Sequence, residues 1–256
     1  MAIITLTTDL GLSDYYVGAV KGKILTECPD ANVVDITHQI RPFDVFQAAF
    51  VLKNVYKDFP EGTIHLTNVE SDLKSSRYLL IKHQHQYFIG HDNGIFFIVF
   101  DGEPEEAYEL DVSENKRYTF PARDVMADFC CKLHRGENPE DIGKRIYNLQ
   151  SLSELQPILG ERSIKGNIIY IDRYENVMVN ITRDMFENAR EGRRFAILFK
   201  RNEFIDSISA RYNEVQDGEK LAFFNVAGYL EIAINKGKAG SLLGLRINDT
   251  VTIEFE

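Results

Sequence analysis

The alternating pattern of the first 150 residues constrains the fold most strongly. Short β-rich runs (AIITLTT, ANVVDIT, GTIHLTNV, YLLIKH, QYFIGH) alternate with amphipathic stretches, YYVGAVKGKILTEC first and VFQAAFVLKNVYKDF second. A later helix is expected from Ala122 to about His134. Strands that alternate with helices favour a sheet of parallel strands with helices on its faces. We therefore expect an N-terminal parallel-sheet α/β domain over residues 1–155.

The second half of the chain follows a different rule. Its apolar runs (GNIIYID, NVMVNIT, RFAILFK, LAFFNVAGYLEIAI, DTVTIEF) are short, are separated by turn residues and show hardly any helical period. Such spacing is typical of antiparallel all-β architectures. We predict a smaller antiparallel β-barrel domain over residues 165–256, after a boundary between residues 151 and 165 where both periodicities are lost.

The net charge of the chain limits the kinds of partner that it can bind. A formal net charge of -10 opposes binding to nucleic acid or to an anionic membrane, because proteins that bind polyanions carry clustered Lys and Arg. A small-molecule substrate is the better expectation. The chain enters its first strand without a basic, apolar leader, and no apolar stretch approaches 18 residues, so we expect a cytoplasmic protein.

The three cysteines point the same way. Cys28, Cys130 and Cys131 are odd in number and two are adjacent, a pattern that fits neither a disulfide framework nor a zinc site. We expect a reducing compartment, with Cys130 and Cys131 as small buried apolar side chains. Too few histidines lie at ligand spacing for a metal centre.

Acidic residues follow several of the expected strands. Asp9 and Asp14 flank a glycine turn after the first strand, and Asp35, Glu70 and Asp92 occupy similar positions later in the chain. Ligands of open parallel sheets bind beyond the carboxyl ends of the strands. From spacing alone two interpretations stay open: Asp9 accepts hydrogen bonds from a polar ligand, or these aspartates cap turns and helices.

The order of several motifs resembles a known family. TDLGLSDYYVGAVKG, VVDITHQIRPFDVFQAAFVL, DNGIF, TFPARDV, YIDRYENVMVNI and GYLEIAINKGKAGSLLGL together resemble the S-adenosylmethionine (SAM) hydrolases, or hydroxide adenosyltransferases, which are related to fluorinase and chlorinase. The resemblance covers nearly the whole chain. It implies an α/β domain, a β-barrel domain, and a homotrimer whose site lies between the first domain of one subunit and the second of the next.

The resemblance also implies a reaction. The family displaces methionine in line from the 5′ carbon of the SAM ribose, with water or halide as nucleophile. The sulfonium group of SAM is its own leaving group, so the protein chiefly aligns the nucleophile and strips its hydration. No metal and no cofactor are implied, and SAM itself is the substrate.

Substrate-binding positions follow by resemblance in the first half. Asp9 matches the aspartate that accepts both ribose hydroxyls, a task suited to a short carboxylate. Asp14, together with Asp172 from the second half, matches acidic positions around the methionine ammonium group. Phe43 and Phe120 match apolar walls around the ribose and the reacting carbon.

The remaining binding positions lie in the second half. Tyr174 and Tyr212 match aromatic positions that sandwich adenine, and Asn176 matches a residue whose amide reads the adenine edge. The backbone near Lys236 matches a segment that hydrogen-bonds adenine. Without the resemblance, an aromatic residue is more often core, and Asn in DRYEN is more often a turn residue.

The catalytic positions depart from the family pattern. Hydrolases carry an Asp, an Arg seven residues later and a His in a TFHGRD-like stretch, where this chain has Glu70, Arg77 and Pro121. Glu70 keeps a carboxylate, but Pro121 has no side-chain hydrogen-bonding group. His91, which follows a strand in GHDNG, is a possible substitute for the lost imidazole, against the simpler interpretation of a capping or exposed histidine. Glu175 replaces a glycine of the usual DRFGN motif.

Three functions follow from these residues. The leading one is a SAM hydrolase that forms adenosine and L-methionine, with Glu70 and Arg77 orienting the attacking water. The second is a protein that binds SAM or another adenosyl compound with little or no turnover. The third uses a different nucleophile or another 5′-substituted nucleoside, halogenation being the weakest variant.

Overall fold

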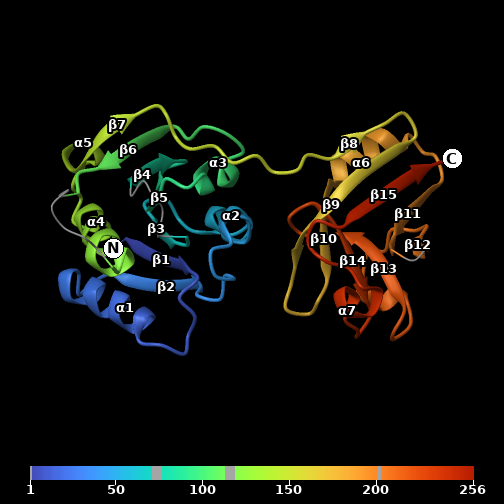
Figure 1. The fold of residues 1–256 in the computed structure, drawn as a ribbon, viewed down its shortest axis with the longest axis horizontal. Coiled ribbons are helices and arrows are strands. Elements are labelled where there is room, and N and C mark those ends of the chain that lie inside the picture. The colour runs from blue at the N-terminus through green and yellow to red at the C-terminus, as the bar shows by residue number, and fades with distance from the viewer. Residues whose placement is uncertain (1, 71–76, 113–118, 201–202) are drawn as a thin grey trace. The chain divides into compact units, whose positions relative to one another are not determined.

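The computed structural model describes residues 2–70, 77–112, 119–200 and 203–256 and divides into two compact units, Met1–Ser153 and Glu154–Glu256. Figure 1 shows both units. In chain order the first unit contains β1 (Ile3–Thr8), α1 (Tyr16–Glu27), β2 (Asn32–Thr37), α2 (Val45–Lys53), η1 (Tyr56–Asp58), β3 (Ile64–Asn68), β4 (Tyr78–His83), β5 (Gln86–His91), α3 (Ile95–Val99), β6 (Glu106–Leu110), η2 (Ala122–Met126), α4 (Ala127–His134), α5 (Pro139–Ile142) and β7 (Gly143–Ile146).

The sheet of the first unit has the strand order β2-β1-β3-β5-β4-β6-β7. The pairs β1–β2, β1–β3 and β3–β5 are parallel, whereas β4, β6 and β7 join in antiparallel pairs. The two-residue turn between β4 and β5 explains the change, because Gln84 and His85 both have positive φ, as a tight hairpin requires. The α/β class is therefore confirmed, with a mixed sheet.

Helices cover both faces of this sheet. On one face α1 and α4 pack over residues of β1, β3, β4 and β5, and on the other α2 and α3 pack over Leu79, Ile81 and Phe88. Alternate residues of the central strands are buried on opposite sides, as a sheet covered on both faces requires. The carboxyl ends of β1, β3 and β5 thus meet along one edge between two helical layers.

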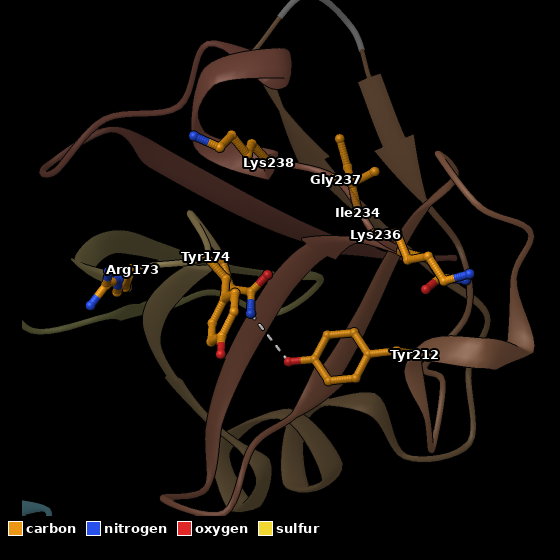
Figure 2. Close-up of a pocket in the computed structure, with 9 residues that line it drawn as sticks. Arg173, Tyr174, Tyr212, Ile234, Lys236, Gly237 and Lys238 are labelled. Atoms are coloured by element: carbon orange, nitrogen blue, oxygen red, sulfur yellow. Dashed lines mark hydrogen bonds between the residues drawn. The ribbon is translucent and has the colours of Figure 1, made fainter.

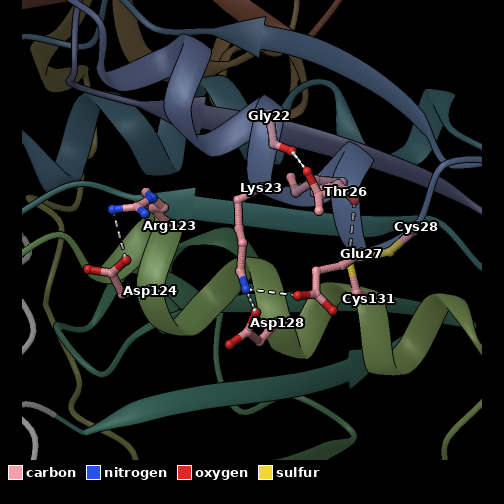
Figure 3. A network of polar contacts seen from close by, with 10 residues as sticks. Gly22, Lys23, Thr26, Glu27, Cys28, Arg123, Asp124, Asp128 and Cys131 are labelled. Carbon is pink, nitrogen blue, oxygen red and sulfur yellow. Dashed lines mark hydrogen bonds and ion pairs between the residues drawn. A yellow bond between two sulfur atoms is a disulfide. The ribbon is translucent and has the colours of Figure 1, made fainter.

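A polar network and a disulfide join α1 to α4 (Figure 3). The Lys23 ammonium lies 2.9 Å from the Glu27 carboxylate and 2.8 Å from that of Asp128. Cys28 and Cys131 form a disulfide across 103 residues, with Cα atoms 5.9 Å apart. The prediction that no disulfide forms was therefore wrong for this pair, since helix packing places the two residues side by side. Cys130 is a buried free thiol, as expected, and burial raises its pKa.

The second unit is an antiparallel β structure. Its elements are β8 (Ile158–Leu159), β9 (Ser163–Ile171), β10 (Val177–Thr182), α6 (Arg183–Arg190), β11 (Phe195–Phe199), β12 (Glu203–Ile205), η4 (Tyr212–Glu214), β13 (Lys220–Phe224), β14 (Tyr229–Ile234), α7 (Ala239–Leu243) and β15 (Thr250–Phe255). The strands follow the order β12-β11-β15-β9-β10-β14-β13, and β12 also contacts β13, so the sheet nearly closes on itself. The predicted barrel is confirmed.

Two helices of this unit, α6 and the shorter α7, were not expected from the sequence. In α6 the Thr182 hydroxyl accepts a hydrogen bond from the Met185 amide at 3.3 Å, and Phe186 is the residue buried beneath it. The signal is short, because a helix of eight residues with a single buried side chain has hardly a periodicity to detect. Among the described residues, no helix is both long enough and apolar enough to cross a membrane.

Candidate functional site

A pocket of about 570 Å³ opens in the second unit (Figure 2). Three segments far apart in sequence meet there: the turn between β9 and β10, the short helix η4, and the loop after β14. The lining residues are Arg173, Tyr174, Asn176, Tyr212, Ile234, Asn235, Lys236, Gly237 and Lys238. Four residues singled out from the sequence, Tyr174, Asn176, Tyr212 and Lys236, thus share one cavity.

Asp172 shapes the turn that carries Tyr174 and Asn176. Its Oδ1 atom accepts hydrogen bonds from the amides of Tyr174 at 2.9 Å and Asn176 at 2.8 Å, and its Oδ2 atom accepts one from Asn176 Nδ2 at 3.2 Å. Three bonds to one carboxylate hold a short turn in a single conformation. Asp172 therefore has a structural task in the pocket wall, and its contact with a methionine ammonium group stays a prediction.

Glu175 ties this turn to the segment after β14 and to α7. Its carboxylate accepts hydrogen bonds from the Ser241 amide at 2.9 Å and from the Ser241 hydroxyl, and pairs with Lys238 Nζ at 3.0 Å. These partners lower the pKa of Glu175, Ser241 most strongly. Glu175 also has a φ of 63°, a left-handed conformation that favours glycine. The contacts with Ser241 and Lys238 compensate for that unfavourable backbone.

A buried carboxylate lies behind the pocket. Glu231, in β14, is 3% exposed, and it accepts hydrogen bonds from the Tyr212 hydroxyl at 3.0 Å and from Asn225 Nδ2 at 3.1 Å. Burial raises the pKa of Glu231, and burial together with the charge of Glu231 raises that of Tyr212. The sequence interpretation missed Glu231. The signal was a lone carboxylate in the apolar strand YLEIAI, since buried acids need specific partners.

Two predicted residues of the first unit meet at the end of β1. The Asp9 Oδ2 atom accepts a hydrogen bond from the Phe43 amide at 2.9 Å, and Phe43 has a φ of 66° and is 67% exposed. Gly11, with a φ of 70°, donates its amide hydrogen to the His38 carbonyl at 2.8 Å. The turn after β1 is therefore fixed against the segment before α2. Among the residues that the structure describes, no hydrogen bond reaches Asp9 Oδ1.

The other two predicted residues of this unit lie near the start of α1. Asp14 is exposed immediately before that helix. The Phe120 ring packs edge-on against the Tyr16 ring, with centroids 5.3 Å apart. Phe120 is half-buried and Tyr16 is partly exposed, which leaves an aromatic surface beside Asp14.

Arg77 is held by a buried acid. Its Nε atom donates to Asp92 Oδ2 at 2.8 Å, and its Nη2 atom donates to the Asn148 carbonyl at 2.6 Å and to Asp92. Asp92 is 3% exposed and also accepts a hydrogen bond from the Gln150 amide at 2.9 Å. Among the described residues, no ion pair joins Arg77 to Glu70.

Glu70 follows β3 and is half-buried, with a φ of 51°. Residues 71–76, which follow Glu70, lie outside the described residues. Glu70 comes after β3 and Arg77 comes before β4, so both residues lie at the edge of the sheet where the acidic residues were expected to gather.

Pro121 stands where the resemblance places a histidine, and His91 is the residue that the sequence offered as a substitute for that imidazole. Pro121 is buried and precedes the helical run of η2 and α4. His91 ends β5, is 2% exposed, and packs on the Tyr78 ring with centroids 4.8 Å apart. In the described part of the chain, neither His91 ring nitrogen has a hydrogen-bond partner. Burial lowers the pKa of His91 to about 4, so the ring is neutral at pH 7. The role of His91 as a substitute imidazole stays a hypothesis.

Together, fold and pocket define a class of protein. It combines an α/β unit, with carboxylates at the ends of its parallel strands, and a barrel whose pocket presents two tyrosines and an amide. Within the described residues, no group of three His, Cys, Asp or Glu side chains is arranged to hold a metal ion.

Family models identify this class. The chain matches the SAM hydroxide adenosyltransferase N-terminal domain over residues 4–143 and the C-terminal domain over residues 166–252. The chain therefore belongs to the SAM hydroxide adenosyltransferase family, and the resemblance drawn from the sequence is confirmed.

Individual relatives agree with this assignment. The chain is 29% identical to the (R)-S-adenosyl-L-methionine hydrolase of Methanocaldococcus jannaschii, covering 99% of this chain and 96% of that protein. It is 27% identical to the hydrolase of the same name from Thermus thermophilus, over 96% and 97%. It is 24% identical to a fluorinase of Nocardia brasiliensis, over 98% and 96%. A crystal structure of an uncharacterized conserved protein from Thermotoga maritima matches with a TM-score of 0.88 at 30% identity, over 98% and 99%.

Proposed function

We propose that this protein hydrolyses SAM to adenosine and L-methionine. Its membership in the SAM hydroxide adenosyltransferase family supports the reaction class. The observation that carries the proposal is the pocket of the second unit, where the four residues matched to adenine recognition line one cavity. These four residues come from three segments that are far apart in the sequence, so their meeting in one cavity supports a common binding role.

In the proposed reaction a water oxygen attacks the 5′ carbon of the ribose. The new C–O bond forms as the bond between that carbon and the sulfonium sulfur breaks, and the electron pair passes to sulfur, which leaves as the neutral thioether of methionine. The water loses a proton to solvent or to a carboxylate. Glu70 and Arg77 are proposed to orient this water, and alignment of the nucleophile is the main source of rate in such displacements.

The proposed contacts with substrate divide between the two kinds of unit. Tyr174 and Tyr212 stack on adenine, Asn176 reads its edge, and the backbone near Lys236 hydrogen-bonds it, all from the pocket described above. Asp172 faces the methionine ammonium group from the same unit.

In the first unit, Asp9 is proposed to accept hydrogen bonds from both ribose hydroxyls. Asp14 joins in binding the ammonium group. Phe43 and Phe120 form apolar walls around the ribose and the reacting carbon, and the exposed Phe43 ring supports such a contact.

The proposal includes a homotrimer in which the site is completed between subunits. Apolar side chains that are exposed in a single copy, among them Leu12 and Tyr15, support an additional interface on the first unit. Light scattering of the purified protein tests it, because a monomer at working concentration contradicts the shared site.

A second candidate function is the binding of SAM or another adenosyl compound with little or no turnover. Two observations favour it: Pro121 carries no polar group, and Arg77 is bound by Asp92 and Asn148. The Nε and Nη2 donors of Arg77 are taken by these partners and Nη1 lies 3.4 Å from Asn148 Oδ1, so a water beside Glu70 competes with these bonds for the guanidinium.

Product analysis separates the two functions. Purified protein is incubated with each sulfonium epimer of SAM, and adenosine and methionine are followed by chromatography. The first function predicts equimolar adenosine and methionine, reduced strongly in Arg77→Lys and unchanged in the control Arg135→Lys, an exposed arginine. Tight binding of SAM without product supports the second function. Absence of both binding and turnover contradicts the adenosyl site.

A further inference from the structure

A chain of hydrogen bonds runs from the barrel interior to the pocket. Asn225 Nδ2 lies 3.1 Å from one oxygen of Glu231, and the other oxygen lies 3.0 Å from the Tyr212 hydroxyl. The Tyr212 oxygen lies 3.2 Å from Asn176 Nδ2, a contact drawn as the dashed line in Figure 2. Asn176 Nδ2 also lies 3.2 Å from Asp172 Oδ2. The chain thus ends on the amide that lines the pocket.

The donors and acceptors of this chain permit a single arrangement. The one hydrogen of the Tyr212 hydroxyl is donated to Glu231 Oε1. The Tyr212 oxygen must then accept from Asn176, and only the amino group of that amide donates. Asp172 independently demands the same amino group, because its carboxylate also only accepts. Both hydrogens of Asn176 Nδ2 are thereby used.

The consequence is a pocket wall of fixed polarity. Asn176 is 6% exposed, and among the described residues no hydrogen bond reaches its Oδ1 atom. This oxygen is the one polar atom of the amide that remains for a ligand, and it accepts a hydrogen bond without being able to donate. A free asparagine would turn its amide to suit either a donor or an acceptor, whereas this one is held.

We propose that the Glu231–Tyr212 pair makes the pocket selective for purines with a 6-amino group over purines with a 6-oxo group. The inference rests on the proposed function, which places a purine in this pocket. The 6-amino group of adenine donates to the fixed Asn176 oxygen. A 6-oxo oxygen in the same place would face the Asn176 oxygen, and because both atoms only accept, no hydrogen bond forms. Glu231 and Tyr212 act here as positioning residues, and Asn176 is the residue that contacts the base.

Binding of adenosine and inosine tests this inference. The two nucleosides differ at the 6-position and at N1, which carries a hydrogen in inosine and none in adenosine. Nebularine has only hydrogen at the 6-position and keeps the bare N1 of adenosine, so it isolates the contribution of the 6-amino group. Dissociation constants are measured by titration calorimetry on the full-length protein. We expect adenosine to bind about 10- to 100-fold more tightly than inosine, the range for one buried hydrogen bond left unmade. Nebularine should fall between them.

Glu231→Gln is the decisive variant. A glutamine keeps the size of Glu231, but its amide oxygen is needed for Asn225, so its amino group faces the Tyr212 oxygen. The Tyr212 hydroxyl hydrogen then points toward Asn176, where it faces the hydrogens of the amino group. The Asn176 amide is then no longer held in one orientation by both of its partners. We expect the preference for adenosine over inosine to fall about tenfold. Glu254→Gln, a change at an exposed residue of β15, is the matched control and should leave the preference unchanged.

Tyr212→Phe provides a second test if Glu231→Gln fails to fold. It keeps the stacking ring and removes one of the two acceptors that hold the Asn176 amino group. Because Asp172 still accepts from that amino group, the preference should fall by less than the roughly tenfold change expected for Glu231→Gln, while adenosine still binds. A purely structural role for Glu231 lowers the melting temperature without changing the adenosine-to-inosine ratio, and this result overturns the inference. Equal affinity of the unmodified protein for both nucleosides also overturns it. If none of the three nucleosides binds, the proposed function fails and the inference fails with it.

Discussion

A buried histidine makes the first unit sensitive to acid. His65 is the second residue of β3 and is fully buried. Its Nδ1 atom lies 2.7 Å from the Thr5 hydroxyl oxygen, its Nε2 atom lies 2.7 Å from Gln86 Oε1, and its ring stacks on Phe88 with centroids 4.7 Å apart. Burial lowers the pKa of His65 from 6.5 to about 4, against the opposing effect of Gln86. The folded protein therefore holds a neutral ring over a range where an unfolded chain takes up a proton.

The sign of the effect follows from proton linkage. Well above pH 6.5 neither state is protonated at His65, and its contribution to the free energy of unfolding is constant. As the pH falls from 6.5 toward 4, the unfolded chain gains a proton that the folded protein does not bind, so stability is lost. Between pH 7 and pH 5 the two pKa values give a loss of about 2 kcal/mol from this residue.

Urea unfolding at the two pH values measures this loss. Because the two units need not unfold together, unfolding of the first is followed by hydrogen exchange of peptides from β1 and β3. In His65→Gln, a variant that keeps hydrogen-bonding capacity without titrating, the drop between pH 7 and pH 5 should be smaller by about 2 kcal/mol. His85→Gln, at an exposed turn, is the control. If His65→Gln loses as much stability between pH 7 and pH 5 as the unmodified protein, the reasoning is refuted. His91 also titrates on unfolding, but it is present in both proteins and does not affect the difference between them.

Other predictions address the pocket and its supports. Tyr174→Ala should raise the dissociation constant for adenosine about 5- to 100-fold through lost stacking, whereas Tyr174→Phe should stay within about twofold in calorimetry; equal effects would contradict stacking. Asp92→Asn should lower the free energy of unfolding in urea by about 3 kcal/mol, because it leaves Arg77 without its buried partner. Glu109→Gln, at an exposed contact 3.8 Å from Arg77, should change it by less than about 0.5 kcal/mol, and a similar cost for both variants would refute the distinction. Glu175→Gly should relieve the left-handed backbone yet speed amide exchange in the turn at residues 172–176 several-fold, and slower exchange would show that the strained backbone outweighs the lost contacts.

Local periodicity was sufficient to predict most of the fold. The switch from a helical period to short alternating strands was visible in single segments, so the α/β class and the barrel could both be predicted. The pairing direction of β4 was decided instead by the two-residue turn at Gln84 and His85. Neither residue is a glycine or an asparagine, the usual signals of such a turn, and the hairpin was therefore hidden.

The pocket of the second unit could be predicted only through motif order. Tyr174 and Asn176 were identified by the DRYEN motif, while Glu231 looked like any residue of an alternating strand. Its importance depends on Tyr212, which lies 19 residues earlier in the chain. Contacts of this kind follow from tertiary packing, as does the disulfide between Cys28 and Cys131.

The proposed binding residues and the proposed catalytic residues differ in how completely their side chains are already in position. In the second unit, the polarity of Asn176 is fixed by partners that are already in place. In the first unit, Arg77 is bound to Asp92, and Pro121 offers no proton acceptor. A departing sulfonium sulfur needs no proton, so the missing imidazole removes help only for the attacking water, a contribution of about 10²- to 10⁴-fold in typical cases. Desolvation and alignment of the water are separate sources of rate and do not depend on that group. Proline at position 121 therefore predicts slow hydrolysis and does not by itself predict an inactive protein. The binding of adenosine should not depend on this residue.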